Sequence, residues 1–153
     1  MNKKSGFTLI EILVVVAIIG LLTALLLVNL VGVRERGADT RKKSNLNQFR
    51  TALRLYYNDF QSYPQADGND NLLGCGDGTS ACAKAGGDDL TNGSGTIYMK
   101  GTPEYTEYSR YNNGDSFYLG VELANESDSG IAESVNLCAP SPATPGVFYI
   151  CSE

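Results

Sequence analysis

One apolar run near the N-terminus constrains this chain more than any other feature. It extends from Phe7 to Val33, reads FTLIEILVVVAIIGLLTALLLVNLVGV, and contains a single ionisable side chain, Glu11. As an α-helix it would be about 40 Å long, which exceeds the hydrocarbon core of a bilayer, about 30 Å. A secretory signal peptide fits poorly, because its apolar region spans only about 7–15 residues and ends at a small-residue cleavage site. The run therefore predicts a transmembrane helix.

Glu11 is the exception within this run. A carboxylate in apolar surroundings costs about 2.5–3.5 kcal/mol on insertion scales, so it is a functional-site candidate that needs a partner. A plain membrane anchor would leave this residue unexplained. The sequence around it reads GFTLIE over residues 6–11 and follows a short basic leader over residues 1–5. The hexapeptide, more than the hydropathy alone, is the motif that indicates a function.

This N-terminus resembles the class III signal of bacterial type IV prepilins and of the related pseudopilins of type II secretion. The resemblance is strong over roughly the first sixty residues and covers the rest of the chain only in outline. It implies that residues 1–6 are a leader, that a prepilin peptidase cuts between Gly6 and Phe7, and that the new N-terminal Phe7 is N-methylated. It also implies that Glu11 pairs with the free amine of a neighbouring subunit as a filament grows.

The chemistry of the hexapeptide is consistent with these roles. Gly6 has no side chain to obstruct a peptidase, and cleavage after it creates an α-amino group with a pKa near 7.7–8, largely protonated at neutral pH. Glu11 would lie in the first turns of the mature helix, where the positive end of the helix dipole favours an anion. A neighbour's ammonium supplies the charge that a buried carboxylate needs. The alternative is that Glu11 only reaches a lipid headgroup.

Charge is divided unevenly along the chain. Residues 1–54 carry nine Lys or Arg and three acids, whereas residues 55–153 carry three Lys or Arg and fourteen acids. The second region is predicted to be a solvated acidic domain, so we expect no specific nucleic-acid partner, because phosphate binding needs Lys and Arg. Beside one membrane helix, the chain has room for a single soluble domain of about a hundred residues.

The orientation in the membrane rests on conflicting signals. More Lys and Arg follow the apolar run than precede it, and their count alone would place the C-terminal side in the cytoplasm. The leader, however, resembles one that is processed on the cytoplasmic side, and the cysteines indicate an oxidising compartment. We therefore predict an inner-membrane protein with a periplasmic soluble domain, which later becomes part of a cell-surface filament or a periplasmic pseudopilus.

The helical pattern continues beyond the apolar run, over residues 34–62. A one-face stripe with spacings of three and four residues indicates an amphipathic half that packs on the soluble domain. Tyr63-Pro64 ends the pattern, since the residue before a proline avoids the helical region. Gly37 costs about 1 kcal/mol relative to Ala and marks a site for a bend, and the proline that kinks this family's helices is absent at Val28. The stripe comprises Leu46, Phe49, Leu53, Tyr56 and Phe60.

The soluble domain, residues 63–153, is predicted to complete an α+β fold, in which the long N-terminal helix packs on a small antiparallel sheet with disulfide-stapled loops. Residues 65–95 are rich in Gly, Asp, Asn and Ser and predict a loop region, or one with a short helix near residues 80–85. Strands are predicted over residues 96–100, 116–124 and 147–150, and Tyr105, Tyr108 and Tyr111 are assigned to a preceding strand or an irregular edge.

Four cysteines allow three disulfide connectivities. The local pairs Cys75–Cys82 and Cys138–Cys151 are favoured because each closes a short loop at low entropic cost. Zinc is a weaker alternative, since the chain has no histidine and the spacing does not match C-x₂₋₄-C. The second loop resembles the C-terminal disulfide loop that many type IV pilins carry.

No enzymatic activity and no cofactor are expected. A Ser-His-Asp or Cys-His set requires histidine, which the chain lacks, and no paired carboxylates stand out. Some pseudopilins bind calcium in a loop after the sheet, and Glu126 and Asp128 offer oxygen ligands at that place. The alternative for these two acids is a solvated loop.

The sequence thus predicts a structural subunit that forms a helical homopolymer through its N-terminal helix, with type IV pilin as the preferred interpretation. Its partners would be other copies of itself, prepilin peptidase, the membrane and the inner-membrane pilus or secretion machinery. A type II secretion pseudopilin is the first alternative. A membrane-anchored adhesive or binding module that does not polymerise is the second.

Overall fold

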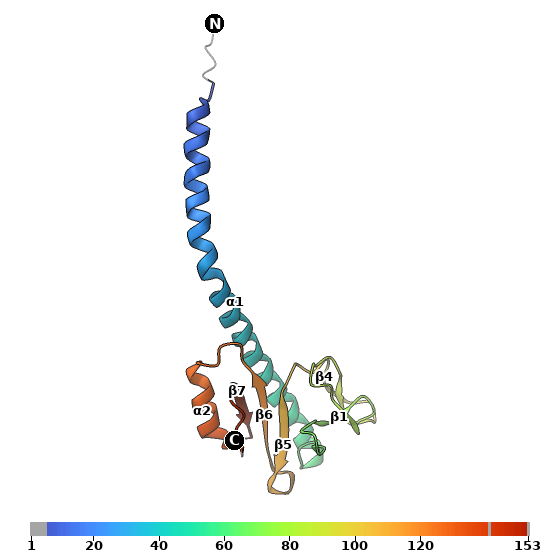
Figure 1. The fold of residues 1–153 in the computed structure, drawn as a ribbon. Coiled ribbons are helices and arrows are strands. Elements are labelled where there is room, and N and C mark those ends of the chain that lie inside the picture. Colours follow the sequence, from blue (N-terminus) through green and yellow to red (C-terminus); the bar gives the residue numbers. More distant parts are fainter. Residues whose placement is uncertain (1–5, 141, 153) are drawn as a thin grey trace. The chain divides into compact units, whose positions relative to one another are not determined.

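The computed structural model describes residues 6–140 and 142–152, with the backbone alone for residues 25–31. Most of the predicted leader, residues 1–5, lies outside the described residues. The chain divides into two compact units, of which one ends at Arg36 and the other begins at Gly37. In chain order the elements are α1 (Leu9–Phe60), β1 (Leu73–Cys75), β2 (Ser80–Ala81), β3 (Leu90–Thr91), β4 (Ile97–Met99), β5 (Glu107–Tyr111), η1 (Asn112–Gly114), β6 (Ser116–Glu122), α2 (Ser129–Cys138) and β7 (Val147–Cys151) (Figure 1).

The helix α1 has nearly the predicted length, since it begins two residues after Phe7 and ends one residue before Gln61. It is continuous at Gly37, the residue with which the second unit begins. Gln61 leaves the helical region with a φ of 52°. The Tyr63-Pro64 pair follows at once, which accounts for the end of the helix at this point.

The predicted stripe on α1 is buried over most of its length. Leu46, Phe49 and Leu53 are fully buried in the main core, together with apolar side chains of β5 and β6. Tyr56 is half-buried, and Phe60 is 47% exposed. The prediction that Phe60 belongs to the core is therefore wrong, since Phe60 lies in the last turn of α1 and is exposed.

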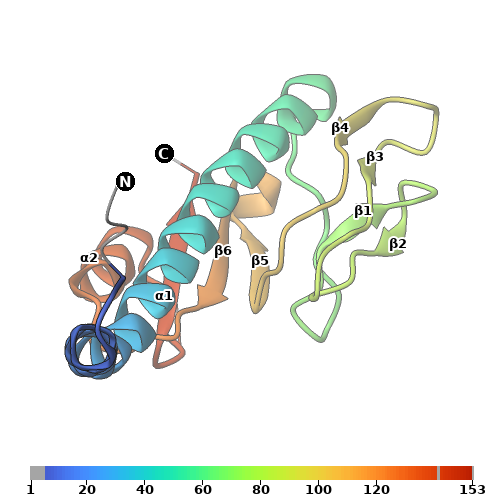
Figure 2. The ribbon, with the colours of Figure 1, turned by 90° about the horizontal axis from the view of Figure 1, so that it is seen from above.

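A three-stranded antiparallel sheet in the order β5–β6–β7 lies along the part of α1 that belongs to the second unit (Figure 2). Phe117, Leu119 and Val121 alternate along β6 and are completely buried in the core with the α1 stripe. The predicted strands over 116–124 and 147–150 are confirmed with small shifts, and Tyr108 and Tyr111 lie on β5 as expected. The turn between β5 and β6 is η1, where Asn113 has a φ of 57°.

A second sheet of four short strands, in the order β2–β1–β3–β4, occupies the region that the sequence predicted as loop. The predicted strand over 96–100 is its edge strand β4. The alternative of a short helix near residues 80–85 is wrong, because β2 pairs there with β1. Strands of two or three residues have too few side chains to show an alternating pattern, so composition alone pointed to a loop.

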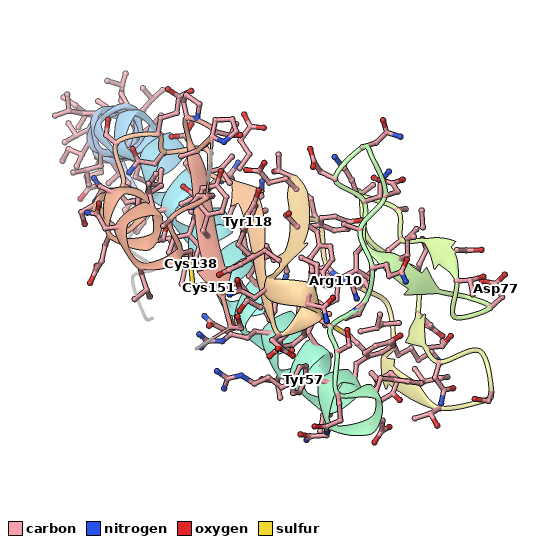
Figure 3. All side chains as sticks on the ribbon, turned by 90° about the horizontal axis from the view of Figure 1, so that it is seen from below. Tyr57, Asp77, Arg110, Tyr118, Cys138 and Cys151 are labelled. Atoms are coloured by element: carbon pink, nitrogen blue, oxygen red, sulfur yellow. A yellow bond between two sulfur atoms is a disulfide. The ribbon has the colours of Figure 1, made fainter. Side chains whose placement is uncertain are left out.

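The helix α2 was not predicted. Asp128 precedes it and accepts a hydrogen bond from the Gly130 N–H at 2.8 Å, which makes Asp128 its N-cap. The Cys138–Cys151 disulfide joins its last residue to the end of β7 (Figure 3). The Cys75–Cys82 disulfide closes the β1–β2 hairpin. The protein therefore has the predicted α+β fold with disulfide-stapled loops, but with two sheets and a second helix.

Candidate functional site

The Gly6–Phe7 bond lies before the first turn of α1, in irregular and exposed backbone. A Cβ atom built on Gly6 would meet nothing within 4 Å, and the Phe7 side chain is 80% exposed. Among the described residues, therefore, nothing covers the bond that the sequence predicted as the cleavage site. An extended, accessible segment is the form in which a peptidase can bind a substrate backbone.

Thr8 and Glu11 form a reciprocal hydrogen-bond pair at the start of α1. The Thr8 backbone N–H and hydroxyl donate to Glu11 Oε2 at 2.9 Å and 2.6 Å, and the Glu11 N–H lies 3.4 Å from Thr8 Oγ1. This is a capping box, in which two otherwise unpaired helix N–H groups are satisfied by side chains. The capping box was not predicted, although its signal, Thr-x-x-Glu in front of an apolar run, is present in the sequence.

The helix that follows exposes apolar side chains in every direction. Between Leu9 and Leu22 its large apolar residues are 49–82% exposed. A helix that is hydrophobic all round is normally buried in a protein core, a bundle or a membrane. The residues concerned are Leu9, Ile10, Ile12, Leu13, Val14, Val15, Val16, Ile18, Ile19, Leu21 and Leu22.

The transmembrane prediction over residues 7–33 covers residues 25–31, whose side chains are not described. Over the described residues, no helix combines the length and the hydropathy required to cross a membrane.

The two acids considered for calcium have different surroundings. Asp128 accepts hydrogen bonds from Lys43 Nζ at 2.6 Å and from the Gly130 N–H. Both bonds lower the pKa of the Asp128 carboxyl group, and the bond from Lys43 has the larger effect. Glu126 is exposed. Within residues 6–140 and 142–152, no group of three or more His, Cys, Asp or Glu side chains gathers as a metal-binding cluster.

Two comparisons place the N-terminal segment among known proteins. Residues 1–27 match the family model of the prokaryotic N-terminal methylation motif. The chain is 36% identical over 67 residues to type II secretion system core protein G of Vibrio cholerae, which covers 44% of this chain and 46% of that protein. It is also 43% identical over 63 residues to the type IV wide pilus major component of Thermus thermophilus, covering 41% of this chain and 48% of the relative.

These comparisons confirm the predicted resemblance to type IV pilins and type II secretion pseudopilins in the N-terminal part of the chain. Another relative is the type IV major pilin of Myxococcus xanthus, 36% identical over 61 residues, 40% of this chain and 28% of that pilin. The matched part spans less than half the length of each of these relatives. No solved structure matches the chain significantly.

Proposed function

We propose that this chain is a type IV pilin, a structural subunit that polymerises through its N-terminal helix into a pilus-like filament. A prepilin peptidase would first cleave between Gly6 and Phe7, and Phe7 would then be N-methylated. The observation that carries the proposal is the all-round apolar surface of residues 9–22, which remains exposed in the isolated chain. Contacts between the helices of neighbouring copies would remove this surface from water.

In this proposal Glu11 sets the axial register of the polymer. Its carboxylate would pair with the Phe7 ammonium of a neighbouring copy, a contact made head to tail that can repeat without closing. The Thr8 hydrogen bonds use Oε2 of Glu11. A carboxylate has about four acceptor positions, so Oε1 can accept the neighbour's ammonium while the capping box persists.

The proposed partners follow from this role. The precursor would reside in the inner membrane with its soluble domain in the periplasm, and would meet prepilin peptidase and the pilus or secretion machinery there. The proposed role is assembly, with no catalysis, cofactor or nucleic acid.

Calcium is not expected to bind at Asp128, because the Lys43 ammonium group already pairs with its carboxylate. We therefore expect calcium and a calcium chelator to leave the thermal unfolding midpoint of the full chain unchanged.

A type II secretion pseudopilin is the second candidate, because relatives that carry the names of both classes match the same N-terminal segment. The Cys138–Cys151 loop favours the pilin, since many type IV pilins carry such a loop near the C-terminus. Deletion of the gene separates the two. A pilin predicts loss of surface fibres, whereas a pseudopilin predicts retention of secreted enzymes inside the cell.

The role of Glu11 can be tested apart from its role in capping. Glu11→Gln keeps an oxygen acceptor for Thr8 but removes the charge, whereas Thr8→Ala removes the capping partner and keeps the charge. We expect Glu11→Gln to abolish sheared surface fibres at an unchanged membrane level, and Thr8→Ala to retain fibres. Glu35→Gln, an exposed acid on the same helix, is the matched control.

The reverse result, with fibres lost in Thr8→Ala and retained in Glu11→Gln, would assign Glu11 to helix capping alone. Mass spectrometry of the mature protein tests the processing step and should find a methylated Phe7 as the first residue. A monomeric protein that retains Met1 and forms no fibre would contradict both the pilin and the pseudopilin. The remaining candidate would then be a membrane-anchored adhesive or binding module that does not polymerise.

A further inference from the structure

The end of α1 lies beside β4 in the second unit (Figure 2). Three aromatic side chains and one acid from these two elements form a corner there. The ring of Tyr56 lies 4.5 Å from that of Phe60 and 5.3 Å from that of Tyr98, centroid to centroid. The Tyr98 hydroxyl donates a hydrogen bond to Asp59 Oδ2 at 2.6 Å. We call Tyr56, Asp59, Phe60 and Tyr98 the aromatic corner.

The aromatic corner lies outside the core and remains accessible. Phe60 is 47% exposed, Asp59 is exposed, and the two tyrosines are half-buried. Burial and the hydrogen bond to Asp59 raise the pKa of Tyr98 to about 12, so Tyr98 remains a neutral donor at physiological pH. The corner therefore combines ring faces with a carboxylate held in place by a hydroxyl group.

This combination suits a guanidinium group better than other ligands. Arginine stacks its planar group on aromatic faces and at the same time hydrogen-bonds a carboxylate. Anionic ligands are disfavoured, because residues 55–153 carry fourteen acids and three Lys or Arg. The complementary charge occurs earlier in the same chain, where residues 34–43 contain five Lys or Arg and two acids.

Within this basic segment, Arg41 is a cation of the second unit that is available to another copy. Lys42 donates hydrogen bonds to Glu104 and to the Glu122 carbonyl, and Lys43 is bound to Asp128. Arg41 is exposed, and its side chain forms no hydrogen bond or ion pair with another described residue. Asp59 lies eighteen residues, or five helical turns, beyond Arg41, so both side chains lie on one flank of α1, about 27 Å apart.

We propose that Arg41 of one copy binds the aromatic corner of a second copy in the fibre. The inference rests on the proposed polymerisation, and it adds a contact between soluble domains to the contact of the N-terminal helices. Two parallel copies offset by about 27 Å along the fibre would bring Arg41 of one copy level with Asp59 of the other. The same offset applied repeatedly would give every copy one filled corner.

Charge reversal tests the contact in cells that produce the full chain. We expect Arg41→Asp and Asp59→Arg each to lower the yield of sheared fibres by about tenfold or more at an unchanged membrane level, because like charges then meet. The double exchange, Arg41→Asp with Asp59→Arg, should restore most of the yield. Glu133→Arg makes the same change on an exposed position of α2 and should have no effect.

Cross-linking tests the geometry without removing the charge. In fibres of the Arg41→Lys variant, a zero-length carbodiimide should join position 41 to Asp59 and produce a ladder of oligomers. The bond must form between copies, because the two positions of one chain are about 27 Å apart. Intact fibres without this cross-link would overturn the proposal.

The remaining outcomes are also decisive. Normal fibres in both single variants, or no recovery in the double exchange, would overturn the contact while leaving polymerisation intact. A fall in membrane level in Arg41→Asp and equally in Arg34→Asp, with Asp59→Arg unaffected, would overturn it in favour of an anionic lipid surface. If the wild-type chain itself forms no fibres, the proposed function fails and this inference fails with it.

Discussion

Three polar residues of α1 hold the loop that follows β6. Asp39, only 3% exposed, accepts hydrogen bonds from the backbone N–H groups of Ala124 and Asn125 at 2.8 Å and 3.0 Å. Lys42 donates to the Glu122 carbonyl, and Lys43 binds Asp128 and lies over the Phe148 ring. Polar side chains on the helix therefore position the loop between β6 and α2, where the sequence offered only a candidate calcium loop.

Removal of the Asp39 carboxylate should be costly. Asp39→Ala leaves two backbone donors without an acceptor, which we expect to lower the free energy of unfolding by about 3 kcal/mol. Urea unfolding of the detergent-solubilised full chain, followed by near-UV circular dichroism, measures the change. The exposed Glu35→Ala on the same helix should differ from wild type by less than about 0.5 kcal/mol. Equal effects of the two variants would contradict the role of Asp39 in holding the loop after β6.

Asp77 in the β1–β2 turn gives a prediction about pH (Figure 3). Hydrogen bonds from the Thr79 and Ser80 N–H groups lower the pKa of its carboxyl group from 3.8 to about 2. A lowered folded-state pKa stabilises the fold above pH 3.8, and this contribution is lost as the pH falls toward about 2. The carboxyl ¹³C resonance of Asp77, assigned by its absence in Asp77→Asn, should titrate near pH 2. Titration near 3.8 would show that the turn does not bind the carboxylate in solution.

At the scale of elements, α1 changes its role along its length. Its stripe is buried at Phe49 and exposed at Phe60, although both residues follow the same spacing. Phe49→Ala should lower the free energy of unfolding by about 3–5 kcal/mol, because it leaves a cavity among fully packed neighbours. Phe60→Ala should cost less than about 1 kcal/mol.

Thermal and urea unfolding of the two full-length variants check this contrast, since the substitution is the same in both. A large loss in Phe60→Ala would mean that the last turn of α1 is covered in solution. That result would place Phe60 in the core after all, and would remove it from the aromatic corner.

At the scale of the whole molecule, the two units differ in what they bury. The main core draws its buried residues from the second unit alone, from Leu46 to Ile150. In the first unit, the large apolar side chains between Leu9 and Leu22 are exposed. The buried core that stabilises the fold therefore lies in the second unit, whereas the first unit presents the apolar surface on which the proposed polymerisation depends.

A truncated chain that begins at Gly37 should consequently fold by itself. We expect it to be monomeric without detergent and to retain the near-UV circular dichroism of its buried tyrosines, because it contains the whole of the main core and both disulfides. Gel filtration with light scattering checks the mass. Loss of the tyrosine signal, or a detergent requirement, would show that the first unit contributes to folding.

The sequence alone predicted the features that depend on long patterns. The apolar run, the stripe through Leu46, Phe49 and Leu53, and the alternation along β6 each repeat a period often enough to be recognised. The GFTLIE motif identified the family resemblance because its spacing is local and specific. The comparisons confirm this resemblance over the N-terminal part, and the α+β fold is the one predicted.

The tertiary structure decided which secondary structure the short segments adopt. The strands β1 to β3 exist because they pair with one another, and α2 exists because Asp128 caps it and the Cys138–Cys151 disulfide anchors it to β7. The sequence by itself determined the long helix and its motif, since those are encoded in local periodicity. The packing around them was decided only in three dimensions, because segments of two to ten residues obtain their structure from distant contacts.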